Sequence, residues 1–267
     1  MTLPNGQKTA LHREWQAFWL AVGFLSRIPM LAKIDYSPRL MSQCSLYFPL
    51  VGLILGALYA ALFAILVQLW SPWICLILVT GFHLWITGAF HEDGLADSVD
   101  ALGGGYSTQA RLRIMKDSRI GTYGTVALTM ALLLKVALLT ESTQIWLVLL
   151  IAPCISRLTP LILMHALGYV SDPDTSKSKP VAEGFTSRRL MIAILFVAIT
   201  SGIFTIWKPM LLLWTATSVL LVAAFWGQQL QRDLGGYTGD ALGASVVLSE
   251  LVFLLLMAAS VPSCCLA

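Results

Sequence analysis

The chain has 267 residues, of which 57% are hydrophobic and only 12% are charged, and its formal net charge is +3. A soluble globular domain carries about 25% charged residues, so charge at this density cannot cover a water-exposed surface. The composition argues against a soluble enzyme, a nucleic-acid-binding module and a disordered chain. The remaining class is an integral membrane protein, which contacts the lipid bilayer and binds no nucleic acid.

The first apolar stretch, residues 15–30, is a weak candidate for a membrane span. It is apolar from Ala17 to Leu25 but is flanked by Arg13, Glu14 and Arg27. A spanning helix needs roughly 20 mostly apolar residues to cross about 30 Å of hydrocarbon. We therefore expect an interfacial or re-entrant helix here.

Seven later segments are long and apolar enough to span. They run approximately over residues 44–70, 72–90, 121–140, 144–170, 188–207, 209–226 and 242–262. The alternation typical of barrel strands is absent. The sequence thus predicts an all-α fold, a polytopic membrane helix bundle of about seven transmembrane helices plus the N-terminal helix, in a single domain over residues 1–267.

The distribution of Lys and Arg predicts the orientation in the membrane. Fourteen of the 17 cations lie either before the first span or in three connections, which are residues 91–120, residues 171–187 with Arg188 and Arg189 at the start of the next helix, and residues 227–241. Positive charge marks the cytoplasmic side. We expect these loops and the N-terminus in the cytoplasm, in a multi-pass protein that is either a monomer or a homo-oligomer.

The carboxylates are clustered more tightly than the cations. Five of the 14 fall within residues 92–117, namely Glu92, Asp93, Asp97, Asp100 and Asp117. On a helix, Asp93, Asp97 and Asp100 share an arc of roughly 60°, while Glu92 lies about 100° from Asp93 and is a weaker ligand. Like charges this close repel, and magnesium would relieve the repulsion. A solvated acidic helix end is the alternative, but acids beside a membrane span favour a functional site.

Two further groups could bind substrate. Arg113, Lys116 and Arg119 belong to a basic run that suits either a phosphate site or simple anchoring at the cytoplasmic surface. Asp240 follows the glycine-rich residues 235–239 and could be a metal ligand, a general base or the N-cap of the last helix. Gly103–Gly105 between the acids and the bases is expected to end a helix or to form a flexible joint.

Ionisable residues also occur inside the predicted spans. Lys135, Arg157 and Glu250 could pair within the bundle or line a polar cavity. Pro153 and Pro160 flank Arg157 and predict a break in that helix. His83 and His165, in apolar surroundings, are expected to be core residues with satisfied hydrogen bonds.

The motifs together resemble the cobalamin synthase family, whose members are adenosylcobinamide-GDP ribazoletransferases. The resemblance is carried by residues 92–100 and 115–121, with shorter matches at residues 24–29, 48–52 and 239–244. It covers nearly the whole chain, and the combination of motifs is specific. One departure is that this chain has His91-Glu92-Asp93-Gly94 where the family pattern often has His-Leu-Asp-Gly, which weakens Glu92 as a ligand more than Asp93.

The resemblance implies an enzyme of the bacterial inner membrane with its active site facing the cytoplasm. Its members join adenosylcobinamide-GDP to α-ribazole, or to its 5′-phosphate, release GMP and need Mg²⁺. On this chain, the expected metal ligands are Asp93 and Asp97, with Asp100 and Glu92 as further candidates. Lys116, Arg119 and Arg113 would bind substrate phosphate, and Asp100 or Asp240 would accept the ribazole hydroxyl proton.

Three other functions are alternatives to this one, and of these a prenyltransferase is disfavoured because its paired Asp-Asp motif is missing from this chain. A CDP-alcohol phosphotransferase also uses acids on membrane helices, but its pattern has Ala-Arg where this chain has Ala96-Asp97. A transporter would favour inverted repeats and acids at the membrane midplane. The sequence shows no such repeat, and its acids cluster at the predicted membrane interface.

Overall fold

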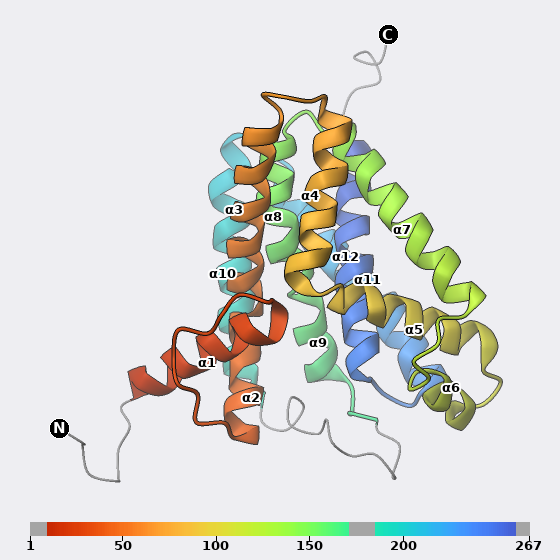
Figure 1. Ribbon diagram of the computed structural model, residues 1–267. Coiled ribbons are helices and arrows are strands. Elements are labelled where there is room, and N and C mark those ends of the chain that lie inside the picture. Colours follow the sequence, from red (N-terminus) through yellow and green to blue (C-terminus); the bar gives the residue numbers. More distant parts are fainter. Residues whose placement is uncertain (1–9, 171–184, 260–267) are drawn as a thin grey trace.

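The computed structural model describes residues 10–170 and 185–259, and within these ranges the chain is helical (Figure 1). The predicted all-α class is confirmed. In chain order the helices are α1 (Ala10–Leu25), α2 (Pro38–Cys44), α3 (Phe48–Leu66), α4 (Pro72–Thr87), α5 (Phe90–Gly104), α6 (Thr108–Ile114), α7 (Thr122–Thr140), α8 (Ile145–Ser156), α9 (Thr159–Ala166), α10 (Ser187–Ile203), α11 (Leu211–Asp233) and α12 (Gly239–Ala259). Short 3₁₀ turns at Ser45–Tyr47 and Phe204–Ile206 join α2 to α3 and extend α10.

Six helical segments of the described chain are long and apolar enough to cross a membrane. They are Pro38–Leu66, Thr122–Thr140, Ile145–Ala166, Ser187–Ile206, Leu211–Asp233 and Gly239–Ala259. The pair α4 and α5 passes the same test only together, bent by 87°, and brings the number to seven. About seven spans were expected, so this prediction is confirmed. The first span begins before residue 44 because Ser37 caps the helix at the Leu40 N–H, which an apolar count does not detect.

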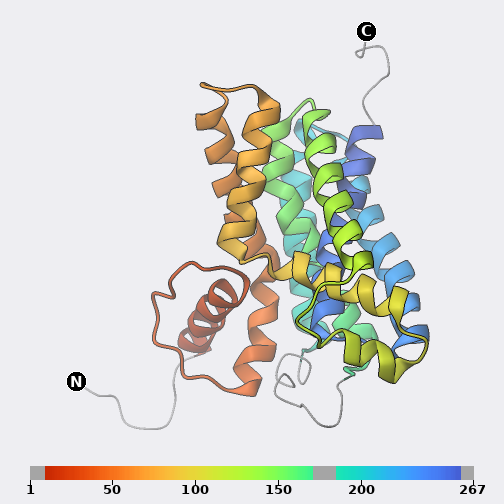
Figure 2. The ribbon, with the colours of Figure 1, turned by 45° about the vertical axis from the view of Figure 1, so that its right-hand side comes forward.

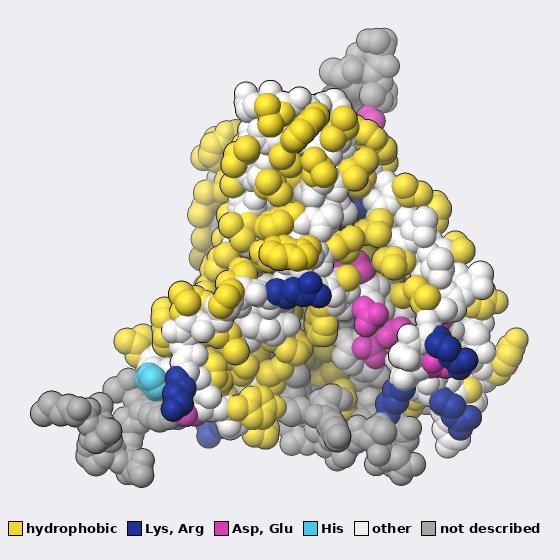
Figure 3. Space-filling model, viewed as in Figure 1, with side chains coloured by type: hydrophobic (Ala, Val, Ile, Leu, Met, Phe, Trp, Pro, Cys, Tyr) yellow, Lys and Arg dark blue, Asp and Glu magenta, His cyan; other side chains and the backbone are white. Residues whose placement is uncertain are grey.

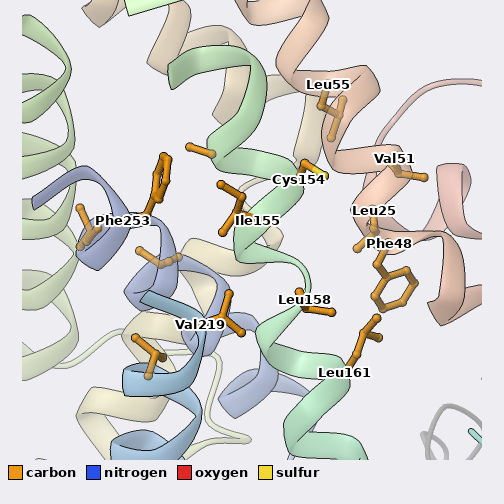
Figure 4. Close-up of a cluster of buried hydrophobic side chains, with 14 of the residues drawn as sticks. Leu25, Phe48, Val51, Leu55, Cys154, Ile155, Leu158, Leu161, Val219 and Phe253 are labelled. Carbon is orange, nitrogen blue, oxygen red and sulfur yellow. The ribbon is translucent and has the colours of Figure 1, made fainter. Parts of the chain in front are cut away.

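The bundle packs around α8. Its span is 89% buried inside the protein, whereas that of α7 is only 22% buried, so α8 is central and α7 faces lipid. Gly52 and Gly56 of α3 lie against the α8 backbone, where a Cβ atom would come within 2.2 Å of the Pro153 carbonyl and 2.1 Å of the Leu150 carbonyl. Figure 4 shows Cys154 and Ile155 between side chains of α3 and Phe253 of α12. Small residues at such contacts are typical of membrane helix pairs.

Hydrophobic and charged side chains occupy different parts of the surface along the helix axes. In Figure 3 hydrophobic side chains cover the upper part of the face, and most of the charged side chains lie in its lower half. Many large apolar side chains on the spans are exposed, such as Trp85 and Phe225. In a bilayer these side chains contact lipid, since hydrocarbon is as apolar as they are.

Helix α1 lies across the lower end of the bundle instead of running with the upright helices (Figures 1 and 2). It has 16 residues and is not among the helices that could span alone. It begins five residues before the predicted stretch because Arg13 and Glu14 belong to its polar face, and Glu14 binds Arg189 at 2.5 Å. As the sequence predicted, this helix is not one that could span the membrane alone.

The chain bends sharply between α4 and α5. Gly88 and Ala89 both adopt left-handed backbone conformations, with φ of 68° and 56°, and Ala89 is the only described non-glycine residue that does so. Helix α5 therefore leaves α4 at 87° and runs across the lower part of the bundle (Figures 1 and 2). We count this pair as one broken span, in which the apolar α4 enters the hydrocarbon and the acidic α5, bent away from it, lies outside the hydrocarbon.

The connections predicted as cytoplasmic loops are shorter than expected. Residues 91–120 hold most of α5 and all of α6, and α5 ends at Gly104 where the glycines predicted a helix end. Residues 227–241 are mostly helix because α11 continues through polar residues to Asp233 and α12 begins at Gly239. A prediction from apolar residues places the end of a helix too early when the last turns of that helix lie outside the bilayer. Most of the loop at 171–187 lies outside the described residues.

Candidate active site

Two separate helices bring three aspartates to one place. Asp93 and Asp97 lie on α5, and Asp240 lies in the first turn of α12. The helices touch at Gly94, where a Cβ atom would be only 2.5 Å from the Asp240 carbonyl oxygen. This close approach is possible because Gly94 has no side chain, and it sets Asp240 beside Asp93 and Asp97. We call these three residues the aspartate cluster.

Repulsion and burial both act on Asp97. Partial burial and the neighbouring carboxylates of Asp93, Asp240 and Asp100 raise the pKa of Asp97 to about 7. Asp93 is exposed, and Asp97 and Asp240 are half-buried, so the cluster is open to solvent. Figure 3 shows acidic side chains gathered in the lower half of this face, with Lys and Arg side chains beside them. A negatively charged cluster of this kind attracts a cation or a proton.

The donor set suits a metal that also uses oxygen atoms of its substrate. Among the described residues, no three His, Cys, Asp or Glu side chains are close enough to form a preassembled metal site. Magnesium typically takes one or two carboxylates together with substrate phosphates and water. Asp93 and Asp97, four residues apart on one helix face, fit that requirement without a third protein ligand.

Asp100 has a different environment from the other aspartates of α5. Its two oxygens accept the backbone N–H groups of Gly121 and Gly124 at 2.7 and 2.8 Å. A Cβ atom at either glycine would lie 2.4 Å from this carboxylate. Asp100 therefore caps the N-terminus of α7, where the helix dipole favours a negative charge. Asp100 shares an arc with Asp97, but it lies about one turn further along α5, where it meets α7.

We expect Asp100→Asn to destabilise the protein by about 1–2 kcal/mol, because the amide loses the charge and turns an N–H toward the amides that need an acceptor. Thermal unfolding of the purified protein in detergent measures this loss. The control is Asp117→Asn, whose exposed carboxylate pairs only with Arg119 among the described residues, and which should leave stability unchanged. An Asp100→Asn protein of normal stability and no activity would instead place Asp100 in the chemistry.

Glu92 points away from the aspartate cluster. Its Oε1 atom lies 2.8 Å from Nε2 of His83 on α4, and Nδ1 of the same ring lies 2.8 Å from the Tyr59 hydroxyl on α3. Glu92 is 4% exposed, whereas the neighbouring Asp93 is exposed. Successive helix residues point about 100° apart, so Glu92 faces the interior and Asp93 faces solvent. His83 is thus the satisfied core residue that was expected; the same expectation for His165 is wrong, because its side chain is exposed.

The charges inside the spans are partly paired. Lys135 of α7 binds Glu250 of α12 at 2.9 Å, and both line a small cavity together with Tyr59 and His83. Arg157 lies at the predicted break between α8 and α9, is 1% exposed, and donates from Nη1 to the Pro153 carbonyl at 2.8 Å. The expected pairing within the bundle is thereby observed for Lys135 and Glu250.

The glycine-rich segment before α12 serves the fold. Tyr237 donates its N–H to the Gly168 carbonyl and accepts the N–H of Val170, both at 2.9 Å. A Cβ atom on Gly236 would be 2.2 Å from the Gly168 carbonyl, so only glycine fits at this position. Thr238 caps α12 by accepting the Ala241 N–H at 3.2 Å. Asp240 is therefore not the N-cap, and its carboxylate is left for the cluster.

The basic run is split between two environments. Arg111, on α6, binds Asp233 at the end of α11 at 3.0 Å, which ties α6 to the bundle. Arg119 pairs with Asp117 at 2.6 Å and is 85% exposed. Arg113 and Lys116 are exposed as well. Arg113, Lys116 and Arg119 thus keep exposed side chains.

Sequence reasoning missed two contributions to the site. The contact at Gly94 joins residues 146 positions apart, and the His83–Glu92 bond depends on the bend between α4 and α5. The sequence signal for the first was the pair of motif glycines, Gly94 and Gly243, since Gly243 also lies against α5 with its Cβ position 3.5 Å from the His91 Cα.

Comparisons with known proteins give one consistent result. The family described as cobalamin-5-phosphate synthase matches residues 17–258. A protein of Vibrio parahaemolyticus named adenosylcobinamide-GDP ribazoletransferase is 41% identical over 261 residues, covering 95% of this chain and 96% of the relative. Proteins of the same name from Vibrio cholerae (43% identity, 93% of this chain and 95% of the relative) and Shewanella halifaxensis (39%, 92% and 95%) are similar. No solved structure matches this chain.

Proposed function

The chain belongs to the cobalamin-5-phosphate synthase family, and from this premise we propose how its residues perform the family's reaction. The reaction joins adenosylcobinamide-GDP with α-ribazole, in the final step of cobalamin synthesis. A CDP-alcohol phosphotransferase and a transporter are not favoured, because the family and relatives named for the ribazole reaction cover nearly the whole chain. The observation that supports the residue assignment is the meeting of Asp93, Asp97 and Asp240 at the contact of α5 and α12.

We assign Asp93 and Asp97 as the residues that would hold Mg²⁺. When bound, magnesium would polarise the pyrophosphate of adenosylcobinamide-GDP and offset negative charge on the leaving phosphate. Asp97 supports this assignment, since its carboxylate is repelled by its neighbours and a cation relieves that repulsion. With a cation held there, Asp93 and Asp97 would repel the pyrophosphate less.

Asp240 is the proposed general base. The nucleophile is a hydroxyl of α-ribazole, whose proton must leave as its oxygen bonds to phosphorus. A base needs a free carboxylate oxygen within hydrogen-bond reach of that hydroxyl. Asp100 does not provide one, because both of its oxygens accept backbone N–H groups. Asp240 lies on the opposite helix from Asp93 and Asp97, so the hydroxyl can lie between the base and the pyrophosphate.

Arg113, Lys116 and Arg119 are proposed to bind the phosphate of the departing GMP. Their side chains are exposed and follow α5 in the chain. Guanidinium groups bind phosphate oxygens with two parallel hydrogen bonds, and an ammonium group adds a point charge. In this arrangement Arg119 would exchange its carboxylate partner Asp117 for a phosphate.

We propose that the protein lies in the bacterial inner membrane with the aspartate cluster and the N-terminus on the cytoplasmic side. The support is the charge asymmetry, because 14 of the 17 Lys and Arg residues fall in segments on one side of the spans. On the face drawn in Figure 3, most of the charged side chains also lie in the lower half. Both substrates would then reach the site from the cytoplasm.

Release of GMP tests the proposed function. Membranes containing the protein should release GMP from adenosylcobinamide-GDP only when α-ribazole is present, and should form the joined cobamide in equal amount. Removing divalent metal with EDTA should abolish the release, and excess Mg²⁺ should restore it, because Asp93 and Asp97 then regain their cation. GMP release without the joined product, or activity that EDTA does not change, would contradict the reaction or the metal assignment respectively.

A further inference from the structure

The cluster of Tyr59, His83 and Glu92 lies outside the chemistry assigned above. Glu92 precedes the proposed ligand Asp93 on α5, His83 is on α4, and Tyr59 is on α3. The two hydrogen bonds that connect them, Tyr59 to His83 and His83 to Glu92, are each 2.8 Å long. These bonds link α3 and α4 to Glu92 of α5, the residue next to Asp93 of the aspartate cluster.

All three side chains are buried, with 3%, 4% and 4% exposure for Tyr59, His83 and Glu92. A buried carboxylate without a hydrogen-bond partner is strongly unfavourable. Oε2 of Glu92 has no partner among the described residues, so the bond from Oε1 to His83 is its principal contact. Turning α5 about its axis would break this bond and leave the carboxylate buried without it.

The joint before α5 leaves its rotation to contacts such as this bond, together with the Asp100 cap on α7 and the close approach to α12 at Gly94. Gly88 and Ala89 carry left-handed backbone angles, so no continuous helix transmits the orientation of α4 to α5. The rotation of α5 must then be set by its side-chain contacts. Since Asp93 directly follows Glu92, the direction in which Glu92 points determines the direction in which Asp93 and Asp97 point.

We propose that Tyr59, His83 and Glu92 form a positioning chain that sets the rotation of α5 and so aims Asp93 and Asp97 at the reacting phosphate. The proposal rests on the function given above and adds residues that touch neither metal nor substrate. Tyr59 orients the His83 ring, and His83 holds Glu92. In metal sites, side chains that orient the ligands typically change affinity or activity by about 10–100-fold when they are replaced.

The test is a double-mutant cycle on purified protein in detergent. The variants are Tyr59→Phe, His83→Gln, Glu92→Gln and the double variant His83→Gln/Glu92→Gln. Each single variant should lower kcat for GMP release by about 10–100-fold, with KM for both substrates nearly unchanged. The double variant should lose no more than its worse single variant, because both changes break the same bond. Mn²⁺ binding in the presence of GMP, followed by electron paramagnetic resonance, should weaken by a similar factor.

Thr215→Val is the matched control, since it removes a buried hydrogen bond of 3.1 Å to Ser201 between α11 and α10. It should keep wild-type kcat and Mn²⁺ binding. Tyr59→Phe removes only a hydroxyl, so it reports on the chain even where a larger change prevents folding. The proposal is overturned if the single variants keep the kcat of Thr215→Val, or if the losses multiply in the double variant. It is also overturned if Mn²⁺ binding weakens in Glu92→Gln but not in Tyr59→Phe or His83→Gln. A wild-type protein that releases no GMP would refute the proposed function instead.

Discussion

Asp97→Asn is expected to reduce GMP release by at least about 10³-fold, and Asp93→Asn should have a comparable effect. Asparagine has nearly the same shape as aspartate but carries no charge, so either variant removes one of the two carboxylates that would hold the metal. Steady-state GMP release at saturating Mg²⁺ measures the loss. Because the side chains are exposed or half-buried, the amount of protein in the membrane should not change.

The control for these variants is Glu141→Gln, which removes an exposed carboxylate at the C-terminal end of α7, far along the chain from the aspartate cluster. It should keep wild-type activity. Near-normal activity of Asp97→Asn or Asp93→Asn would contradict the assignment of that residue as a ligand. Loss of the protein from the membrane would show a structural role instead.

Asp97→Asn should lower activity and at the same time raise thermal stability. The pKa of Asp97 is raised from 3.8 to about 7 in the folded protein, by burial and by its acidic neighbours. A raised carboxyl pKa means that ionisation of Asp97 opposes folding, so its contribution to stability falls as the pH rises from about 4 to about 7. In the presence of EDTA, Asp97→Asn should be more resistant to thermal unfolding than the wild type at pH 8, and this difference should shrink at pH 4.

Gly94→Val is expected to reduce GMP release by at least about 10²-fold, because misplacement of reacting groups by about 1 Å can have that effect. A Cβ atom at Gly94 would be 2.5 Å from the Asp240 carbonyl oxygen, which is a backbone atom and cannot rotate away. The two helices must separate, which moves Asp240 away from Asp93 and Asp97. Overpacking of this kind costs about 1–3 kcal/mol, so the protein should remain folded.

Gly81→Ala is the matched control for Gly94→Val. Gly81 lies within α4, and nothing is within 4 Å of its Cβ position. Alanine also has a higher helix propensity than glycine, so this variant should be as active and at least as stable as the wild type. Gly94→Val with wild-type kcat would show that the contact of α5 with α12 does not position the site.

Much of the fold could be predicted from the sequence, because each span is a local property. A run of about 20 apolar residues crosses the membrane whatever its neighbours are, and the expected spans agree with the structure apart from their ends. The helical period likewise placed Asp93 and Asp97 on one face of α5 and Glu92 on another. Helix ends were less predictable, since they depend on caps such as Ser37 and Thr238.

The assignment of individual acids could not be predicted in the same way. Asp93, Asp97 and Asp100 share one arc of a helix, yet Asp100 reaches the N-terminus of α7 and caps it. Glu92 faces His83 only because α5 leaves α4 at 87°. What each carboxylate does is decided by the helix it faces, and residue spacing within one helix carries no information about that neighbour.

The sequence by itself determined the membrane class, the family and the segment that carries the chemistry. These follow from composition, apolar length and motif, which are properties of residues near one another in the chain. Only the tertiary structure decided that Asp240 joins Asp93 and Asp97, and that Glu92 and Asp100 turn to other partners. The physical reason is that burial, repulsion and hydrogen bonding depend on distances between helices, and the bend at Gly88–Ala89 and the contact at Gly94 set those distances.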